Sequence, residues 1–293
     1  MTRRILQLIS IIVGSMVVIL FFSQNAKANS SRVETINYRL KYRDREYRKS
    51  ALVYLPAGYE RSRRYNVLYM MHGSTETPRE FFNDGHFQQR LDKQIAAGQL
   101  QPSIVVFPTY YPSRNFVSSN YYRDKSLNRA FAQHELIQDL VPAVEGHYRT
   151  FAKGTSAQAL QASRQHRAFG GFSMGAITTW YVFQSQLPYF ADYLPIAGDS
   201  WTVKNDGGAR APQQTAQRLA QTAHEHPQLD FHIFAGVGRN DGTSASMTPQ
   251  IRVMHRLPAF SDDRLQYYHL PAGTHSPQTT SRIVMHYANQ LFR

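Results

Sequence analysis

Residues 167–181 have the sequence Arg-Ala-Phe-Gly-Gly-Phe-Ser-Met-Gly-Ala-Ile-Thr-Thr-Trp-Tyr, which changes character at Ser173. A short apolar run precedes the serine, and a segment with helical character follows it. Gly171 and Gly175 flank the serine and lack the Cβ atoms that would keep a strand and a helix apart at a tight turn. This stretch therefore predicts a strand, a sharp turn at Ser173 and a helix.

Gly-x-Ser-x-Gly between a strand and a helix is typical of a serine nucleophile. The strained turn exposes the serine Oγ at the carboxyl edge of a sheet, and the N-terminus of the helix offers N–H groups to a developing oxyanion. The alternative is an ordinary turn into a helix with no catalytic role, but the flanking strand and helix favour the functional interpretation. We predict that Ser173 is the catalytic nucleophile.

Apolar runs on both sides of this stretch predict a largely parallel sheet, because central parallel strands are continuous apolar segments. Thr35–Tyr42 and Tyr47–Leu55 alternate in character and predict an antiparallel N-terminal hairpin. Helices between the strands predict the α/β class, with helices on both faces of the sheet. The expected strands are Asn66–Met71, Ser103–Phe107, Arg167–Phe172, Tyr193–Ala197, Leu229–Val237 and Leu265–Leu270, and the expected helices are Phe87–Ala97, Ala130–Tyr148, Met174–Gln184, Ala211–His224 and Ser276–Phe292. The polar segment Thr150–Gln165 predicts a surface loop.

An oxyanion would need two backbone N–H donors near Ser173. The first is expected from Met174, the residue after the nucleophile, and the second from the loop that follows the strand Asn66–Met71. That loop is His72-Gly-Ser-Thr75, and we expect the second donor to be Ser74, with Thr75 as the alternative. His72 is expected to be a buried residue that braces the loop.

Chain order identifies the partners of the nucleophile, because this architecture places an acid and then a histidine after the serine. His275 is the histidine that follows the last expected strand on a loop, where a general base can reach the serine Oγ. Asp241 follows the strand Leu229–Val237 and is the expected acid. Asp199, after the preceding strand, is the alternative acid.

Taken together and in order, several motifs resemble the esterase D / feruloyl esterase family of α/β-hydrolases. They are Tyr69-Met-Met-His-Gly73, Val141-Pro-Ala-Val-Glu-Gly-His-Tyr148, Gly171-Phe-Ser-Met-Gly175, Ala197-Gly-Asp-Ser-Trp201 and Gly273-Thr-His275. The resemblance implies an α/β-hydrolase fold and a serine esterase that needs no metal or cofactor. It places the nucleophile, acid and base on Ser173, Asp241 and His275. It also implies that Asp199 and Trp201 line the substrate cleft, where the indole of Trp201 would stack on an aromatic acyl group or a sugar.

The N-terminal segment predicts export. Arg3 and Arg4 precede a mostly apolar run over residues 5–22, and Ala26-Lys-Ala28 fits a signal-peptidase site. We therefore expect a signal peptide at 1–28, a single esterase domain at 29–293, and a secreted or envelope-associated protein. An uncleaved membrane anchor is the alternative. The chain has no cysteine, which excludes disulfides and thiol catalysis.

The chain carries a formal net charge of +13, and three of its cationic residues lie in segment 1–28. Because the basic residues are spread along the chain, we expect a solvated basic surface and no nucleic-acid partner. The expected substrates are feruloyl or acetyl esters linked to carbohydrate. A broad short-chain carboxylesterase, an envelope acyltransferase of the mycolyltransferase type and a non-enzymatic carbohydrate-binding relative are the alternatives.

Overall fold

The computed structural model describes residues 30–293, so the signal peptide expected at 1–28 lies outside the described part of the chain. An eight-stranded sheet forms the centre of the molecule, with the strand order β1-β2-β4-β3-β5-β6-β7-β8. The strands are β1 (Arg32–Tyr42), β2 (Arg45–Leu55), β3 (Asn66–Met71), β4 (Ser103–Phe107), β5 (Arg167–Phe172), β6 (Asp192–Ile196), β7 (His232–Gly238) and β8 (Leu265–Leu270). The predicted fold class is confirmed.

The sheet is parallel from β4 to β8, and among the strands of residues 30–293 β2 is the one that runs in the opposite direction, since it is antiparallel to both β1 and β4. Strands β1 and β2 pair over their whole length, from Arg32 opposite Leu55 to Tyr42 opposite Arg45. The turn between them is made by Arg43 and Asp44, which both have positive φ angles, as the tightest hairpins require. The predicted hairpin is therefore confirmed, and it forms one edge of the sheet.

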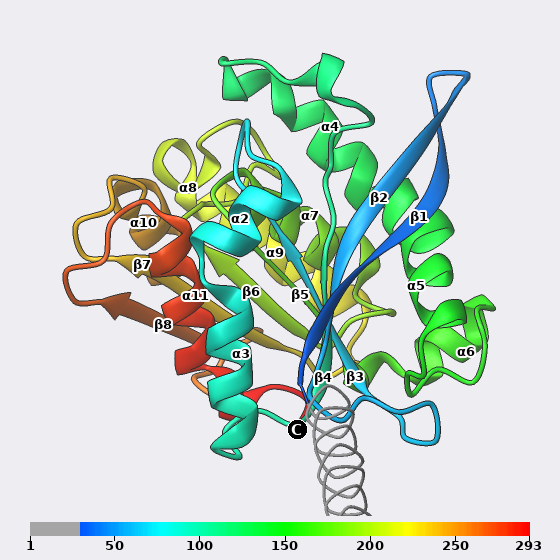
Figure 1. Ribbon diagram of the computed structural model, residues 1–293. Helices are drawn as coiled ribbons and strands as arrows, with labels where there is room; N and C mark the ends of the chain where they lie inside the picture. The colour runs from blue at the N-terminus through cyan, green and yellow to red at the C-terminus, as the bar shows by residue number, and fades with distance from the viewer. Residues whose placement is uncertain (1–29) are drawn as a thin grey trace, which may run out of the picture.

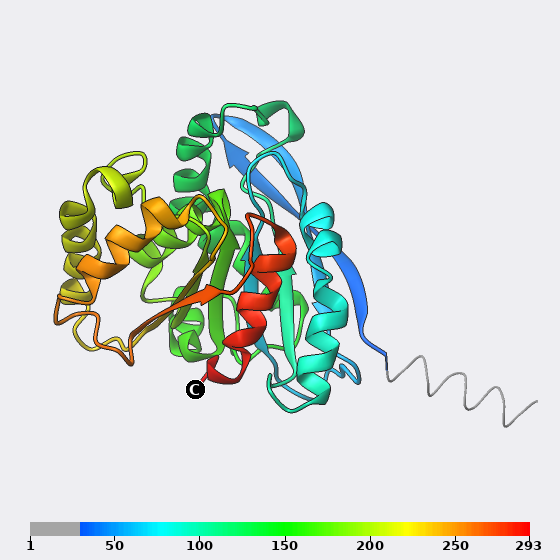
Figure 2. The same cartoon turned by 90° about the vertical axis from the view of Figure 1, so that its left-hand side faces the viewer.

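Helices cover both faces of the sheet (Figures 1 and 2). Helices α2, α3 and α11 pack on one face, while η3, α5, α7 and α9 pack on the other. The α-helices of residues 30–293, together with the π-helix η3, are α2 (Pro78–Asp84), α3 (Phe87–Ala96), α4 (Lys125–Ala130), η3 (Phe131–Leu140), α5 (Val141–His147), α6 (Ala157–Ala162), α7 (Met174–Gln186), α8 (Gly207–Arg210), α9 (Pro212–Glu225), α10 (Ser244–Met254) and α11 (Pro277–His286). Short 3₁₀ turns occur at η1 (Arg114–Phe116), η2 (Tyr121–Asp124), η4 (Arg164–His166) and η5 (Ala288–Gln290).

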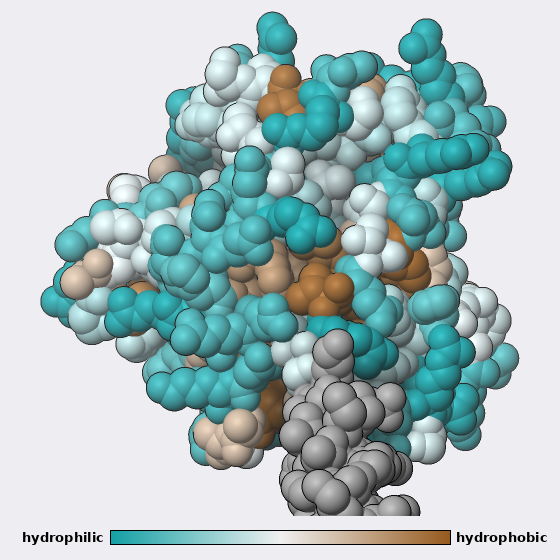
Figure 3. Space-filling view, in the orientation of Figure 1, coloured by the Kyte–Doolittle hydropathy of each residue, from teal (hydrophilic) through white to brown (hydrophobic). Residues whose placement is uncertain are grey.

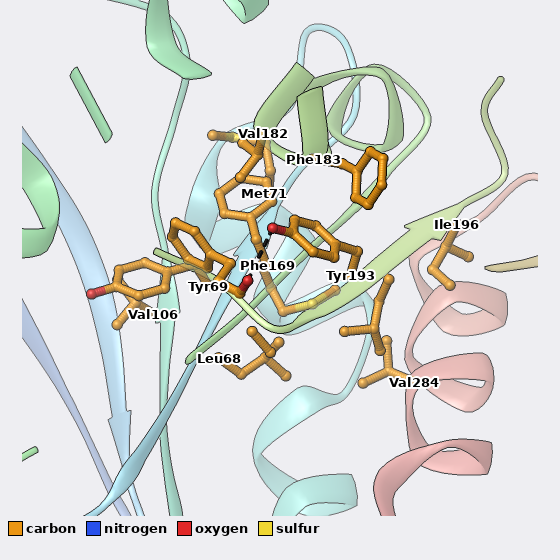
Figure 4. Packing of buried hydrophobic residues seen from close by; sticks show 14 of the residues in the cluster. Leu68, Tyr69, Met71, Val106, Phe169, Val182, Phe183, Tyr193, Ile196 and Val284 are labelled. Carbon is orange, nitrogen blue, oxygen red and sulfur yellow. Dashed lines mark hydrogen bonds between the residues drawn. The ribbon is translucent and has the colours of Figure 1, made fainter. Parts of the chain in front are cut away.

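The hydrophobic core fills the space between the sheet and these two helical layers. In Figure 4, Val182 and Phe183 of α7 lie on one side of the sheet, and Leu68 and Val284 lie on the other. All four are buried, with at most 1% of each residue exposed. The face of the molecule seen in Figure 3 is by contrast mostly hydrophilic. The apolar runs of the sequence thus pack the helices against both faces of the sheet, which fixes the positions of the strand ends.

The predictions for residues 130–148 and 150–165 need correction. The helix expected at Ala130–Tyr148 starts earlier, at Lys125, and its central ten residues form a π-helix, η3, flanked by α4 and α5. The five-residue spacing of Phe131 and Leu136 suits the wider π turn, because both side chains then face the core. The segment 150–165 is not a plain loop, since it contains α6.

No helix within residues 30–293 has the length and apolar character needed to cross a bilayer. The loops at the carboxyl ends of the parallel strands gather in the upper half of Figure 1, together with α2, α8 and α10. In α/β sheets of this kind, ligands bind at that edge. The predicted functional residues follow β3, β5, β6, β7 and β8, so the topology brings them to one edge of the sheet.

Candidate active site

Ser173 lies at the turn between β5 and α7. Its backbone has φ 55° and ψ −114°, a conformation that residues with side chains seldom adopt. The two flanking glycines are needed for packing. A Cβ atom on Gly171 would overlap the backbone of Gly175, and a Cβ atom on Gly175 would overlap the carbonyl of Met71. Gly171 therefore allows strand β5 to meet the start of α7, and Gly175 allows α7 to pack against the end of β3.

Ser173, His275 and Asp241 form a continuous chain of hydrogen bonds. The Nε2 atom of His275 lies 3.0 Å from Ser173 Oγ. Its Nδ1 atom lies 3.0 and 2.9 Å from the two carboxylate oxygens of Asp241. The Asp241 side chain is fully buried, whereas the His275 side chain is 40% exposed. This is the geometry in which an imidazole can take a proton from the serine while the carboxylate orients the ring.

Burial alone would raise the pKa of Asp241, but hydrogen bonds from His275 and Thr243 outweigh burial and hold the pKa below its ordinary range. Thr243 donates twice to the carboxylate, from its N–H at 2.9 Å and from its hydroxyl at 2.7 Å. Asp241 is therefore an anion at neutral pH and can stabilise a charged imidazole. Thr243 is not among the site residues predicted from the sequence, because its role depends on the turn that follows β7.

The loop that carries His275 is packed against neighbouring backbone. Gly273 lies so close to Gly238 that a Cβ atom on either residue would crowd the other. The N–H of Thr274 donates to Thr279 Oγ1 at 3.0 Å, which ties the loop to the start of α11. The ring of Phe172 lies 4.6 Å from the imidazole of His275. These contacts fix the ring beside Ser173 without covering it.

The structure distinguishes the two residues considered for the second oxyanion donor. The N–H of Thr75 already donates to the hydroxyl of Tyr111 at 3.0 Å. Within residues 30–293, the N–H of Ser74 donates to no other group, and neither does that of Met174. Both Ser74 and Met174 line the pocket at Ser173. The geometry therefore favours Ser74 over Thr75, and its role stays a prediction.

A buried carboxylate, Asp124, organises the loop that carries Ser74. Its Oδ2 atom accepts hydrogen bonds from Ser74 Oγ at 2.8 Å, Tyr110 Oη at 2.9 Å and Tyr111 Oη at 2.8 Å. Burial raises the pKa of Asp124, and these three donors act in the opposite direction. Asp124 comes 50 residues after Ser74, so local sequence patterns gave no signal of this contact.

His72 has the bracing role predicted for it. The ring is fully buried, with Nδ1 at 2.6 Å from the Gly73 carbonyl and Nε2 at 2.8 Å from Thr109 Oγ1. Burial lowers the pKa of His72 to about 4, so the ring is neutral at physiological pH. Glu76 holds the same loop by accepting a hydrogen bond from the N–H of Gly73 at 2.7 Å. Sequence reasoning missed Glu76, although it follows directly after the residues predicted to form the loop.

Asp199 and Trp201 both line the pocket, but neither is free. The carboxylate of Asp199 accepts from the N–H of Gly208 at 2.7 Å and from the indole N–H of Trp201 at 3.3 Å. Asp199 makes no hydrogen bond to His275 in the described residues, so the geometry does not support it as the alternative acid. Trp201 is 2% exposed, and Tyr122 stacks on its indole at 5.4 Å.

The exposed aromatic surface at this site belongs to the tyrosines of η2. Tyr121 and Tyr122 are 43% and 38% exposed, and their rings stack on each other with centroids 4.5 Å apart. Tyr121 lines the pocket, while the hydroxyl of Tyr122 donates to Asp206 at 2.9 Å. Any stacking on a substrate ring is therefore better suited to Tyr121 than to the covered indole of Trp201.

The pocket around Ser173 has a volume of about 630 Å³, within the range of small-molecule sites. One part of its wall is polar and includes Ser173, His275 and the backbone of Gly73 and Ser74. The other part is apolar and is formed by Phe172, Met174, Ile177, Ala197, Trp201 and Pro277. Among residues 30–293, no cluster of three or more His, Asp or Glu side chains is arranged to hold a metal ion.

Comparison with known proteins gives several matches. Residues 46–191 match the family described as "Putative esterase". The chain is 38% identical over 236 residues to endo-1,4-beta-xylanase Y of Acetivibrio thermocellus. This match covers 78% of this chain and 20% of that protein. It is 29% identical over 139 residues to an endo-1,4-beta-xylanase/feruloyl esterase of Xylanibacter ruminicola, which covers 45% of this chain and 17% of that protein. The chain thus spans about a fifth or less of the length of these curated relatives.

A solved structure covers most of the chain. It is a serine-to-alanine mutant of the feruloyl esterase module from Clostridium thermocellum, complexed with sinapinate. Its identity to this chain is 32%, its TM-score is 0.77, and the match covers 90% of this chain and 89% of that module. The agreement in both sequence and fold extends over nearly the whole described structure.

Proposed function

Since the chain belongs to the esterase family that includes the feruloyl esterase modules, we propose that it hydrolyses carboxylic esters with Ser173 as nucleophile, His275 as general base and Asp241 as the orienting acid. The observation that carries this proposal is the hydrogen-bonded chain from Ser173 Oγ through His275 to the buried carboxylate of Asp241. This chain opens onto a pocket large enough for an ester with an aromatic acyl group.

The first half of the reaction forms an acyl-enzyme. Ser173 Oγ attacks the carbonyl carbon of the ester while His275 Nε2 takes its proton. The negative charge that develops on the carbonyl oxygen is stabilised by the N–H groups of Met174 and Ser74. The tetrahedral intermediate then collapses, the charged imidazole returns the proton to the departing alkoxide, and the alcohol leaves.

The second half of the reaction restores the serine. His275 Nε2 takes a proton from a water molecule, whose oxygen attacks the acyl carbon attached to Ser173. The same two N–H groups stabilise the second oxyanion. Collapse of this intermediate returns the proton from His275 to Ser173 Oγ and releases the carboxylic acid. The residues in these steps act without a metal or a cofactor.

We propose carbohydrate-linked feruloyl or acetyl esters as the substrates. The relatives carry xylanase and feruloyl esterase in their names, and the similar solved structure holds sinapinate, an aromatic acid. In this chain, the exposed ring of Tyr121 and the apolar wall at Ile177 and Met174 suit an aromatic acyl group. The N-terminal sequence supports a secreted or envelope-associated location, where such polymers are found.

Purified protein would be tested on p-nitrophenyl acetate, p-nitrophenyl butyrate, methyl ferulate and acetylated xylan, each beside Ser173→Ala. We expect turnover of at least one ester and its loss in the variant by ~10⁴-fold or more. Folded protein that turns over none of these esters would refute simple hydrolysis. Comparable rates for the variant would refute the role of Ser173.

A further inference from the structure

A second groove lies directly behind the ester pocket. It has a volume of about 440 Å³ and is bordered by α4, α7 and α9. Trp201 is the residue that lines both cavities, so the two lie next to each other at this residue. Tyr181 of α7 forms the floor of the groove, and its hydroxyl donates to the carbonyl of Trp201 at 2.9 Å. No step of the proposed reaction uses the groove.

The groove carries an excess of positive charge. Lys125 and Arg129 stand four residues apart on α4, and Arg218 lies across from them on α9. Within residues 30–293, none of these three cations forms an ion pair. Glu225 is the one acid among the lining residues, and its carboxylate accepts a hydrogen bond from Gln221. The groove therefore has a net charge of about +2.

The positive charge reaches the floor of the groove. Burial raises the pKa of Tyr181 to about 12, and the guanidinium of Arg129 acts in the opposite direction. Arg129 and Tyr181 line the same groove, and the Tyr181 hydroxyl is bonded to the carbonyl of Trp201. A carboxylate in this position would find a guanidinium beside a wall of amides and hydroxyls, which Gln133, Gln184 and Thr202 contribute. That combination matches an anionic, polyhydroxylated ligand.

The chain also connects this groove to the exposed aromatic rings. Tyr121 and Tyr122 of η2 lead directly into α4, which begins at Lys125. Tyr121 lines the ester pocket, and both tyrosines contact Trp201. A sugar chain whose ester enters the pocket and that continues past the aromatic rings would therefore approach these cations. The two cavities are placed for one extended ligand.

We propose that this groove binds a uronic-acid residue of the polysaccharide that bears the ester, so that the preferred substrates are acidic, uronate-bearing polysaccharides. This inference rests on the proposed esterase function. The uronate carboxylate pairs with Arg129 and Arg218, with Lys125 nearby, and its hydroxyl groups bond the amides of the groove. The ester carbonyl then lies at Ser173, on the other side of Trp201.

The test measures binding by Ser173→Ala protein, which separates recognition from turnover. The probes are 4-O-methylglucuronoxylotriose and the neutral xylotetraose, titrated by calorimetry at low ionic strength. We expect the acidic probe to bind about tenfold more tightly than the neutral one, the effect of two or three exposed charge pairs. The Arg129→Gln/Arg218→Gln variant should lose this preference, and Lys125→Gln should reduce it. Arg252→Gln, which removes an exposed charge on α10 outside the groove, should keep it.

Equal affinity for the two probes, or a preference that survives in the double variant, would overturn the inference. A single-stranded oligonucleotide serves as a polyanion control. If the double variant lost binding to the oligonucleotide but kept the preference for the uronate probe, the groove would belong to another ligand. Hydrolysis of p-nitrophenyl acetate by the unmodified enzyme reports separately on the proposed function. If the enzyme did not hydrolyse p-nitrophenyl acetate, the proposed esterase function would fail, and the binding experiment could still be interpreted. If it hydrolysed this ester but showed no preference for the uronate probe, only the proposal of a uronate-binding groove would be refuted.

Discussion

Ser173 is held in a backbone conformation that residues other than glycine seldom adopt, with φ 55° and ψ −114°. Such a conformation costs about 1–3 kcal/mol and persists only where the surroundings enforce it. Here the N–H of Ser173 donates to the Ile196 carbonyl at 3.0 Å, and its own carbonyl accepts from Ala176 at 2.9 Å and Ile177 at 3.1 Å. The strain is therefore maintained by strand β6 and the first turn of α7, and its result is an Oγ atom exposed beside His275.

The role of Asp241 can be tested with a side chain of the same shape. Asp241→Asn keeps the packing but offers an amide to His275, which favours the wrong tautomer of the ring. We expect kcat on p-nitrophenyl acetate to fall by ~10⁴-fold, the loss that this change produces in a serine protease. The Asp199→Asn variant is the matched comparison, because Asp199 is also a buried acid in the pocket. If Asp199→Asn were the more damaging change, the assignment of the acid would be wrong.

The raised pKa of Glu76 predicts that the stability of the folded protein depends on pH. Burial raises the pKa of its carboxyl from an ordinary 4.5 to about 7, although the hydrogen bond from Gly73 acts in the opposite direction. The folded state therefore binds this proton more tightly than the unfolded state. The resulting stability is complete below pH 4.5 and is lost as the pH rises through 7.

Glu76→Gln removes this titration and retains an oxygen that can accept from Gly73. We expect the Tm of the variant, relative to the unmodified protein, to increase between pH 4.5 and pH 8 and then to stay constant. Thermal unfolding followed by circular dichroism across this range measures the difference. A difference that does not vary with pH would show that Glu76 keeps an ordinary pKa.

Site residues could be predicted where a local motif or the order of the strands marks them, and could not be predicted where their role depends on contacts between distant parts of the chain. Ser173, Asp241 and His275 could be predicted because a local motif and the order of the strands point to them, and the structure brings the three together. Asp124 and Glu76 could not be assigned in this way. Their positions depend on tertiary contacts with the Ser74 loop, and a lone acid in a loop has no periodic signature.

At the scale of elements, agreement was best where the chain is buried on all sides. The bounds of β3 and β4 match the predicted ranges because each is a buried apolar run with polar or proline residues at its ends. The bounds of β5 and β8 match the predicted ranges as well. Helix α6 was missed because it is only six residues long and lies within a largely polar segment, although Ser156 caps it by accepting from the N–H of Ala159. The last helix is shorter than predicted, since α11 ends at His286 and the chain then turns to donate from Phe292 to Asp192.

The π-helix η3 is joined to the hairpin by a buried ion pair that the sequence did not reveal. Lys49 of β2 pairs with Glu135 of η3, and both side chains are at most 4% exposed. Tyr38 of β1 donates to the same carboxylate at 2.6 Å, and Lys49 also donates to the Thr109 carbonyl at 2.7 Å. The pair thus connects the edge hairpin to the helical layer and to the loop after β4.

Removing one member of this pair leaves the other charge buried. We expect Lys49→Met to lower the free energy of unfolding by about 3–5 kcal/mol, because Glu135 loses its counter-ion. The double variant Lys49→Met/Glu135→Leu should recover most of this loss, since no charge is then left in the core. Denaturant unfolding of the three proteins measures both differences. Equal losses in the single and double variants would contradict this account.

At the scale of the whole molecule, the topology explains why scattered residues meet. Six parallel strands end at the same edge, so residues from positions 73 to 277 line one pocket although they are distant in sequence. The fold class could be predicted from alternating strands and helices. The groove behind Trp201 could not, because its cations come from α4 and α9 and the sequence shows them only as part of a dispersed positive charge.

The proposed ester hydrolysis depends on a covalent intermediate at Ser173, and trapping that intermediate tests it most directly. The protein would be mixed rapidly with p-nitrophenyl butyrate, quenched in acid within the first turnover, digested and analysed by mass spectrometry. We predict a burst of p-nitrophenol approaching one equivalent and a butyryl group on the peptide that contains Ser173. Ester turnover with no acyl group on that peptide, or with the acyl group on another residue, would contradict the account.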